Sequence, residues 1–192
     1  MKSNLFNMIA ALLVVSVCSA ASIGYVYQKT SEPIAQAKQA KIMSAIQEMV
    51  GTFDNNPIEE KTAISGNDVE LYPARENGTI TSVAVKSFSN QGFGGKIELI
   101  LGILMDGTVT GYKVTQQNET PGLGSQVTEE KFSSQFVGLN THSNKFRLSK
   151  DGGEIDAVTG ATISSKAVID AVQKAVSAYN NFAGAISHDT EE

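Results

Sequence analysis

The hydrophobic positions near the amino terminus form one unbroken apolar stretch. Residues 5–27 read LFNMIAALLVVSVCSAASIGYVY and contain no charged residue. This length matches the roughly 20 apolar residues that an α-helix needs to cross the hydrocarbon core of a bilayer. Tyr25 and Tyr27 stand at one end, where aromatic side chains favour the membrane interface. We therefore predict a single transmembrane helix within residues 1–28.

The flanking charges predict how this helix is oriented. Lys2 and the α-amino group precede the apolar stretch. Positive charge at that end favours a cytoplasmic amino terminus, which places the rest of the chain on the outer, periplasmic side of the cell (inner) membrane. A cleaved signal peptide is the alternative, although the apolar run is longer than a typical h-region. Lipoprotein processing at Cys18 is disfavoured because the bulky Val17 precedes it.

Beyond the apolar stretch, the pattern first indicates a helix and then a loop. Residues 33–50 place apolar side chains near helical spacing. Pro33 suits a first helical turn, and Gly51 suits a helix end. Residues 54–77 are polar and broken by glycine and proline, so we expect a loop with at most one short strand.

From Thr79 onward, strand-forming residues dominate. Residues 96–105 and 108–115 flank Asp106-Gly107, the strongest short-range hairpin signal in the chain. We expect these two arms at the centre of an antiparallel sheet. The shorter elements expected after them are a helix over residues 127–136 and strands over residues 145–148 and 154–158.

Residues 165–182 carry the clearest amphipathic helical pattern, which Ser164 or Ser165 can cap. Its apolar face consists of Val168, Ile169, Val172, Val176 and Tyr179. The whole pattern predicts an α+β fold, with a central antiparallel sheet flanked by helices. The expected divisions are the transmembrane segment 1–28, a connecting helix and loop 29–78, one sheet-containing domain 79–187 and an acidic tail 188–192.

Composition narrows the function. The chain is 41% hydrophobic and 18% charged, as in globular proteins, and its net charge of −5 with no basic cluster argues against a nucleic-acid partner. Cys18 is the only cysteine, so this chain alone cannot hold an iron–sulfur cluster or an internal disulfide. His142 and His188 have no partner at ligand spacing, which predicts no metal site. Paired catalytic carboxylates and a G-x-G-x-x-G nicotinamide motif are also lacking.

One stretch points to a ligand. Residues 156–168, DAVTGATISSKAV, join a short apolar strand to the last predicted helix. A glycine before a helix lets the backbone approach a ligand closely, and the first helical turn offers free N–H groups and a positive dipole end. Gly160 and Thr162 therefore suit an anion such as a phosphate. The alternative is that this stretch is only a well-capped helix start.

The same stretch resembles a known signature. Residues 156–162, DAVTGAT, are similar to the flavinylation signature of the FMN-binding domain family, which is an Asp, two variable residues, Ser or Thr, then Gly-Ala-Thr. In that family the last threonine is joined to the FMN phosphate by a phosphoester bond. The resemblance implies that Thr162 carries one covalent FMN, attached by a separate flavin transferase, and that Thr159 is its upstream companion.

Two further stretches strengthen this resemblance. Residues 118–124, NETPGLG, resemble the loop that lies against the flavin in the G subunit of Rnf complexes and in the C subunit of the sodium-pumping NADH:quinone oxidoreductase. Residues 92–95, GFGG, resemble the glycine-rich turn before a central strand in that family. The cofactor-binding residues that the resemblance implies are Glu119, Thr120, Gly122, Leu123, Gly124, Asp156, Thr159, Gly160, Ala161, Thr162, Ile163 and Ser164.

The chemistry of the side chains suggests a role for each of several of these residues. Asp156 is not expected to bind the phosphate, because two anions repel, so it is assigned to holding the loop or to recognition by the transferase. The 120–124 stretch offers backbone groups and one apolar side chain to the flavin ring. Ile163 adds apolar cover, and Ser164 is expected to donate to the phosphate. Turn formation by Gly122 and helix capping by Ser164 are equally weighted alternatives.

The resemblance implies a membrane-anchored flavoprotein that relays electrons within an Rnf-type, ion-translocating ferredoxin:NAD+ oxidoreductase. Such a chain is an electron-transfer component without a complete active site of its own, and its partners are the other membrane and peripheral subunits. One alternative is the C-type subunit of a Na+-translocating NADH:quinone oxidoreductase. Another is a cofactor-free, anchored assembly module.

Overall fold

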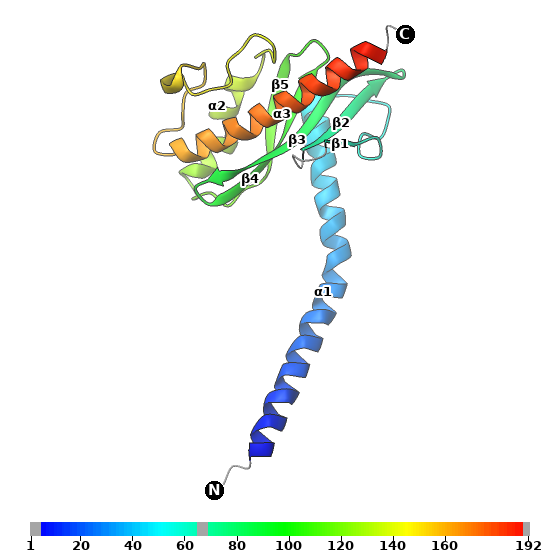
Figure 1. Cartoon of the computed structure of the whole chain (residues 1–192), viewed down its shortest axis with the longest axis vertical. Helices are drawn as coiled ribbons and strands as arrows, with labels where there is room; N and C mark the ends of the chain where they lie inside the picture. The colour runs from blue at the N-terminus through cyan, green and yellow to red at the C-terminus, as the bar shows by residue number, and fades with distance from the viewer. Residues whose placement is uncertain (1–4, 65–68, 190–192) are drawn as a thin grey trace. The chain divides into compact units, whose positions relative to one another are not determined.

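The computed structural model describes residues 5–64 and 69–189 (Figure 1). Lys2, Gly66 and the last residues of the predicted acidic tail lie outside these ranges. The chain divides into two compact units, residues 1–41 and residues 42–192. One helix, α1 (Leu5–Val50), begins in the first unit and ends in the second.

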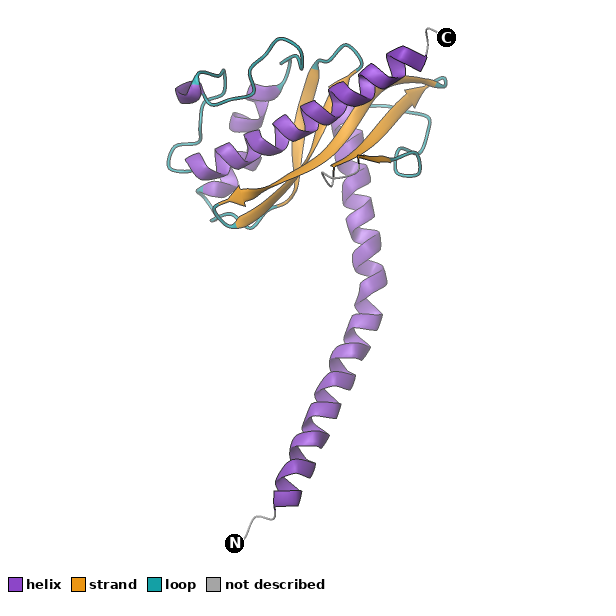
Figure 2. Ribbon diagram, viewed as in Figure 1, coloured by secondary structure: helices purple, strands orange, loops and turns teal. Residues whose placement is uncertain are grey.

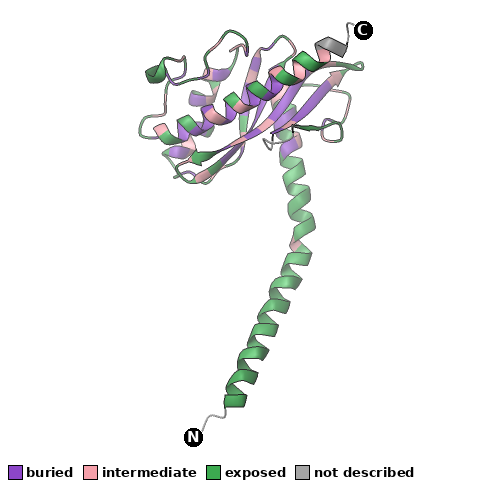
Figure 3. Cartoon of the chain, viewed as in Figure 1, coloured by how far each residue is buried: buried purple, intermediate pink, exposed green. Residues whose placement is uncertain are grey.

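Within the first unit, α1 exposes its apolar side chains. Leu12 is 74% exposed and Phe6 is 79% exposed, and Figure 3 colours nearly all of this part of α1 as exposed. Among the described residues, α1 is the one helix long and apolar enough to cross a membrane. Pro33 lies inside α1, so the predicted helix start at this residue is wrong. Good helix formers such as Ala, Gln and Lys surround Pro33, and the helix continues through it.

The second unit is built on a five-stranded antiparallel sheet with the strand order β1-β2-β3-β4-β5 (Figure 2). Its strands are β1 (Thr62–Ile64), β2 (Val69–Glu76), β3 (Thr79–Gly92), β4 (Gly95–Leu104) and β5 (Val109–Gln116). The predicted hairpin at Asp106-Gly107 is confirmed, because β4 and β5 pair on either side of it. Gly107 has φ +85°, a left-handed conformation that glycine adopts without strain.

The long helix α3 (Thr162–Asp189) covers one face of this sheet. Successive strand residues point to opposite faces, so Val83 and Val85 lie in the core beneath α3, whereas Ala84 lies on the other face. The predicted apolar helix face is confirmed. All five of its residues belong to the main core cluster: Val168, Ile169, Val172, Val176 and Tyr179.

The other sheet face packs against the end of α1. Ile42, Ala45 and Ile46 form a second cluster with Tyr72, Ala84 and Ile100 from the sheet. Gly51 ends the helix with φ +79°, as predicted. The Thr110 hydroxyl also donates a hydrogen bond to the Met49 carbonyl oxygen at 2.5 Å. The end of α1 is therefore part of the folded domain.

Three local predictions need correction or refinement. The segment 54–77 contains the full strand β2 as well as β1, so it is more than a loop with one short strand. Residues 145–148 and 154–158 form no strands; a single bridge joins Leu148 and Ile155, and the 3-10 helix η3 (Ser149–Asp151) lies between them. The helix expected over residues 127–136 is a series of short turns. These are η1 (Gly124–Thr128), α2 (Glu130–Ser133) and η2 (Ser134–Phe136).

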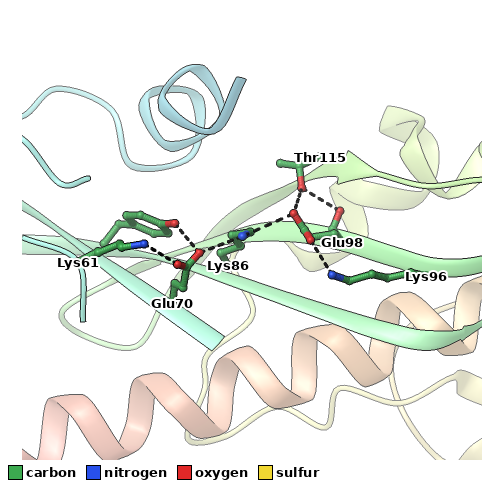
Figure 4. A network of polar contacts seen from close by, with 7 residues as sticks. Lys61, Glu70, Lys86, Lys96, Glu98 and Thr115 are labelled. Atoms are coloured by element: carbon green, nitrogen blue, oxygen red, sulfur yellow. Dashed lines mark hydrogen bonds and ion pairs between the residues drawn. The ribbon is translucent and has the colours of Figure 1, made fainter. Parts of the chain in front are cut away.

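A chain of charged side chains crosses the sheet face opposite α3 (Figure 4). Glu70 lies 2.8 Å from the Lys61 ammonium and 2.9 Å from the Lys86 ammonium, and it accepts a hydrogen bond from the Tyr72 hydroxyl. Lys86 continues the chain to the buried Glu98 at 3.7 Å. Partial burial alone raises the pKa of Glu70. The hydrogen bonds from Lys61, Lys86 and Tyr72 outweigh that effect and lower the pKa to about 2.

This low pKa predicts an acid-sensitive contribution to stability. Because the pKa in the folded state lies below its ordinary value of 4.5, Glu70 stabilises the fold fully above about pH 4.5, and this stability is lost as pH falls towards 2. We expect Glu70→Gln to flatten the fall in Tm between pH 5 and pH 2, measured by circular dichroism on detergent-solubilised protein. Glu129→Gln, at an exposed position outside the network, should keep the wild-type acid slope.

Candidate functional site

Three segments far apart in the sequence meet around one cavity of about 320 Å³. They are the turn between β3 and β4, the loop after β5, and the start of α3 with the residues before it. The lining residues are Phe93, Glu119, Thr120, Leu123, Gly124, Gly160, Ala161, Thr162, Ile163 and Ser164. Nine of the twelve residues predicted to bind the cofactor are therefore on this cavity.

A buried carboxylate joins the three segments. Glu119 is only 5% exposed. Its Oε1 accepts a hydrogen bond from the Gly94 N–H at 3.0 Å, and its Oε2 accepts one from the Ser164 hydroxyl at 2.5 Å. The sequence places Glu119 in the loop 118–124 that resembles the family's flavin-contacting loop, but it does not predict that this side chain connects the loop to the turn and to α3.

Glycines make this close approach sterically feasible. A Cβ on Gly94 would lie 1.9 Å from the Asn118 carbonyl oxygen, and one on Gly92 would lie 2.5 Å from Glu119 Oε1. A Cβ on Gly124 would lie 2.6 Å from Glu119 Oε2. Real side chains do not approach so closely, so the backbones can pack around the carboxylate only where no side chain is present.

The start of α3 presents hydrogen-bond donors to the cavity. The helix begins at Thr162, earlier than the predicted Ser165, and its first N–H groups have no partner within the helix. Gly160 turns the chain just before it with φ +77°. Within residues 5–64 and 69–189, no group pairs with the partly exposed Thr162 hydroxyl. Thr162 thus combines a free nucleophilic oxygen with a positive helix end, a suitable place for a phosphate.

The serines that follow Thr162 are engaged elsewhere. Ser164 is buried, and its hydroxyl donates a hydrogen bond to Glu119. The Ser165 hydroxyl accepts from the Val158 N–H and donates to the Ala161 carbonyl, so it holds the preceding loop and does not cap a helix that starts at residue 165. The groups that this helix start can offer to an anion are therefore the backbone N–H groups of its first turn.

Apolar side chains form the open walls of the cavity. Phe93 is 71% exposed, Ile163 is 52% exposed and Leu123 is 44% exposed. Each comes from a different one of the three segments. Phe93 is not among the predicted site residues, although it lies in the glycine-rich turn that carries part of the resemblance. One sequence signal could have identified Phe93: it is a large aromatic residue between two glycines, in a turn where a packing role is not expected.

Three predicted residues lie off this cavity. Asp156 and Thr159 line a separate cavity of about 400 Å³ on residues 126–135 and 156–159. Asp156 accepts from the Ser149 hydroxyl at 2.6 Å, and its N–H donates to the Gln135 side chain at 2.7 Å, which fits the role of holding the loop. Gly122 has φ +71°, and its N–H donates to the Ser125 hydroxyl, as a turn-forming residue does. No cluster of metal-ligating side chains occurs in the described part of the chain.

Comparison with known proteins agrees with this arrangement. The model of the FMN-binding domain family matches residues 92–177, which include the glycine turn, the Glu119 loop and the start of α3. The G subunit of the ion-translocating oxidoreductase complex of Vibrio cholerae is 31% identical over 185 residues, covering 88% of both chains. Its namesake from Methanosarcina acetivorans is 36% identical over 177 residues, covering 88% of this chain and 92% of the relative.

Among solved structures, the C subunit of the Na+-translocating NADH-quinone reductase from Parabacteroides distasonis aligns over 60% of this chain and 62% of its own, with 24% identity and a TM-score of 0.47. Shewanella oneidensis NqrC aligns over 62% of this chain and 63% of its own, with 25% identity and a TM-score of 0.45. The sequence relatives match along nearly their whole length, and on that ground the chain belongs to the family of G subunits of ion-translocating oxidoreductase complexes.

Proposed function

We propose that this protein carries one FMN, bound covalently to Thr162, and relays electrons as a component of an Rnf-type, ion-translocating oxidoreductase complex. The observation that carries the proposal is the Thr162 hydroxyl, which is unpaired among the described residues and lies at the positive end of α3 on the shared cavity. Family membership supports the electron-transfer role and the FMN.

The residues of the cavity fit the parts of FMN. The N–H groups at the start of α3 and the helix dipole suit the phosphate, and the flat apolar ring suits walls made by Phe93, Leu123 and Ile163. The only charged residue among those that line the cavity is Glu119, and both of its oxygens already accept hydrogen bonds. FMN supplies the redox chemistry when bound, and the protein supplies its position and surroundings.

The attachment step needs a separate enzyme. A bond forms between Thr162 Oγ1 and the phosphorus, the hydroxyl proton is lost, and a leaving group departs from the phosphorus. The donor is therefore an activated flavin nucleotide, such as a flavin dinucleotide that releases its other nucleotide half. Aside from the hydrogen-bonded Glu119, the residues that line the cavity include no side chain that could act as a base, so a flavin transferase supplies the activation.

The relay role makes the chain dependent on other subunits. This chain has no nicotinamide motif and no catalytic His, so electrons reach and leave it through the other subunits of the complex. A C-type subunit of a sodium-pumping NADH:quinone oxidoreductase is the less supported alternative, because the relatives that match along most of their length are G subunits. A cofactor-free assembly module is the other alternative, and it predicts a colourless protein.

Intact-mass analysis tests the proposal directly. The full chain, co-expressed with a flavin transferase and purified from membranes, should carry one FMN-sized adduct, and peptide mapping should place it on Thr162. It should also fluoresce in a denaturing gel, because the ester leaves the ring intact. Unmodified mass in a host that flavinylates a control substrate would remove the redox role and favour the assembly module.

The side of the membrane is a further part of the proposal. Positive charge before the apolar segment favours a cytoplasmic amino terminus, with the flavin domain outside. A tethered cofactor suits that side, because a dissociated flavin there would have no pool to replace it. We expect a periplasm-dependent phosphatase fused after Glu192 to be active and a cytoplasm-dependent fluorescent reporter at the same position to be dark. The reverse pattern would contradict this orientation.

A further inference from the structure

On the basis of the proposed function, we infer that Phe93 covers the isoalloxazine ring, so that the β3–β4 turn is the third wall of the cofactor site. Phe93 lies between Gly92 and Gly94, at the tip of the two longest paired strands. A phenyl ring that is 71% exposed is unfavourable in water, and no other part of the described chain packs over it. It lines the same cavity as Thr162.

The position of this turn is fixed relative to Thr162. The Gly94 N–H donates to Glu119 Oε1, and Glu119 Oε2 accepts from Ser164, two residues after Thr162 in α3. Gly94 is also packed against the Asn118 backbone, closer than any side chain would allow. The backbone of Phe93 is thus held beside the start of α3, and only its side chain remains free to rotate over a bound ring.

The chemistry of the cavity favours a flat, uncharged ring as the occupant. Leu123 and Ile163 add apolar surface from the other two segments, and Glu119 is the only charged residue among the lining ones. Aromatic rings stack in offset or edge-to-face geometry, which a phenylalanine beside a flavin can satisfy. A protein partner that docked on Phe93 instead would leave the tethered ring uncovered on this side.

The absence of tryptophan from the chain gives a clean test. Tryptophan stacked on a flavin quenches flavin emission by electron transfer, which requires contact. In flavinylated, detergent-solubilised full chain, Phe93→Trp should lower flavin emission several-fold per FMN, with the FMN content fixed by mass. The control is Val137→Trp, because Val137 is similarly exposed at 57% but does not line the cavity. This control should keep the wild-type emission.

The outcomes separate this inference from the proposed function. A fully flavinylated Phe93→Trp protein with wild-type emission would overturn the inference while leaving the covalent FMN intact. An unflavinylated wild type would overturn the proposed function itself. If Phe93→Trp fails to fold or to accept flavin, Phe93→Ala gives a second readout: iodide should quench its flavin several-fold more effectively than it quenches the wild type. Equal iodide quenching of the two proteins would also overturn the inference.

Discussion

Replacing Thr162 with alanine is expected to abolish the FMN adduct completely. The ester needs an oxygen at the start of α3, and the other unburied hydroxyl on the cavity, that of Thr120, belongs to the loop after β5. Ser164 is buried and donates to Glu119, and Ser165 is buried and holds the preceding loop. The flavin signal should therefore fall from one per chain to the detection limit, in both intact mass and in-gel fluorescence. Stability should change little, since the Thr162 hydroxyl is unpaired among the described residues.

Two control variants make this result specific. Thr162→Ser keeps a hydroxyl at the same place and should retain most of the adduct. Thr159→Ala removes the other threonine of the signature, which is exposed and lines the neighbouring cavity, and this variant should retain some of the adduct. An adduct that persists in Thr162→Ala and maps to Thr159 would show that the attachment site has been assigned to the wrong residue.

Local sequence signals predict the parts of the fold that local interactions decide. Asp106-Gly107 between two β-forming runs specifies a hairpin, because the turn residues and the strand residues agree. The strand β2 escapes prediction because Pro73 lies within it, and proline in a strand normally argues against one. The local sequence does not show that β2 accommodates this proline. The expected strands around Leu148 and Ile155 are too short to pair beyond one bridge.

The site is predictable where a contiguous motif carries it and not where long-range contacts build it. Residues 118–124 and 156–164 can be singled out from their residue types and order. The bond between Glu119 and Ser164 spans 45 positions along the chain, and the one between Glu119 and Gly94 spans 25. No repeating pattern of residues in the sequence predicts either of these two hydrogen bonds. For the same reason, the sequence could not show that Asp156 and Thr159 face a different cavity from Thr162.

Replacing Gly94 with alanine is expected to destabilise the domain strongly, because a Cβ there would make the closest contact found at any described glycine. The added Cβ would lie 1.9 Å from the Asn118 carbonyl oxygen and 2.5 Å from its carbon, and both are backbone atoms that no rotamer change can move. The loop before Glu119 must then shift, which breaks the Gly94 N–H bond to the carboxylate. Overpacking of this kind costs ~3 kcal/mol. For a chain of this size, that loss lowers Tm by roughly 6–12 °C.

The matched control is Gly184→Ala in α3, where an added Cβ has nothing within 4 Å and alanine favours the helix. Its Tm should stay at or slightly above that of the wild type. Because Glu119 connects the β3–β4 turn, the loop after β5 and α3, Gly94→Ala should also lower FMN loading several-fold at a temperature where the protein is still folded. A variant with a lowered Tm but full loading would mean that the turn stabilises the fold without shaping the cofactor site. Unchanged values for both would contradict the packing of Gly94 against Asn118.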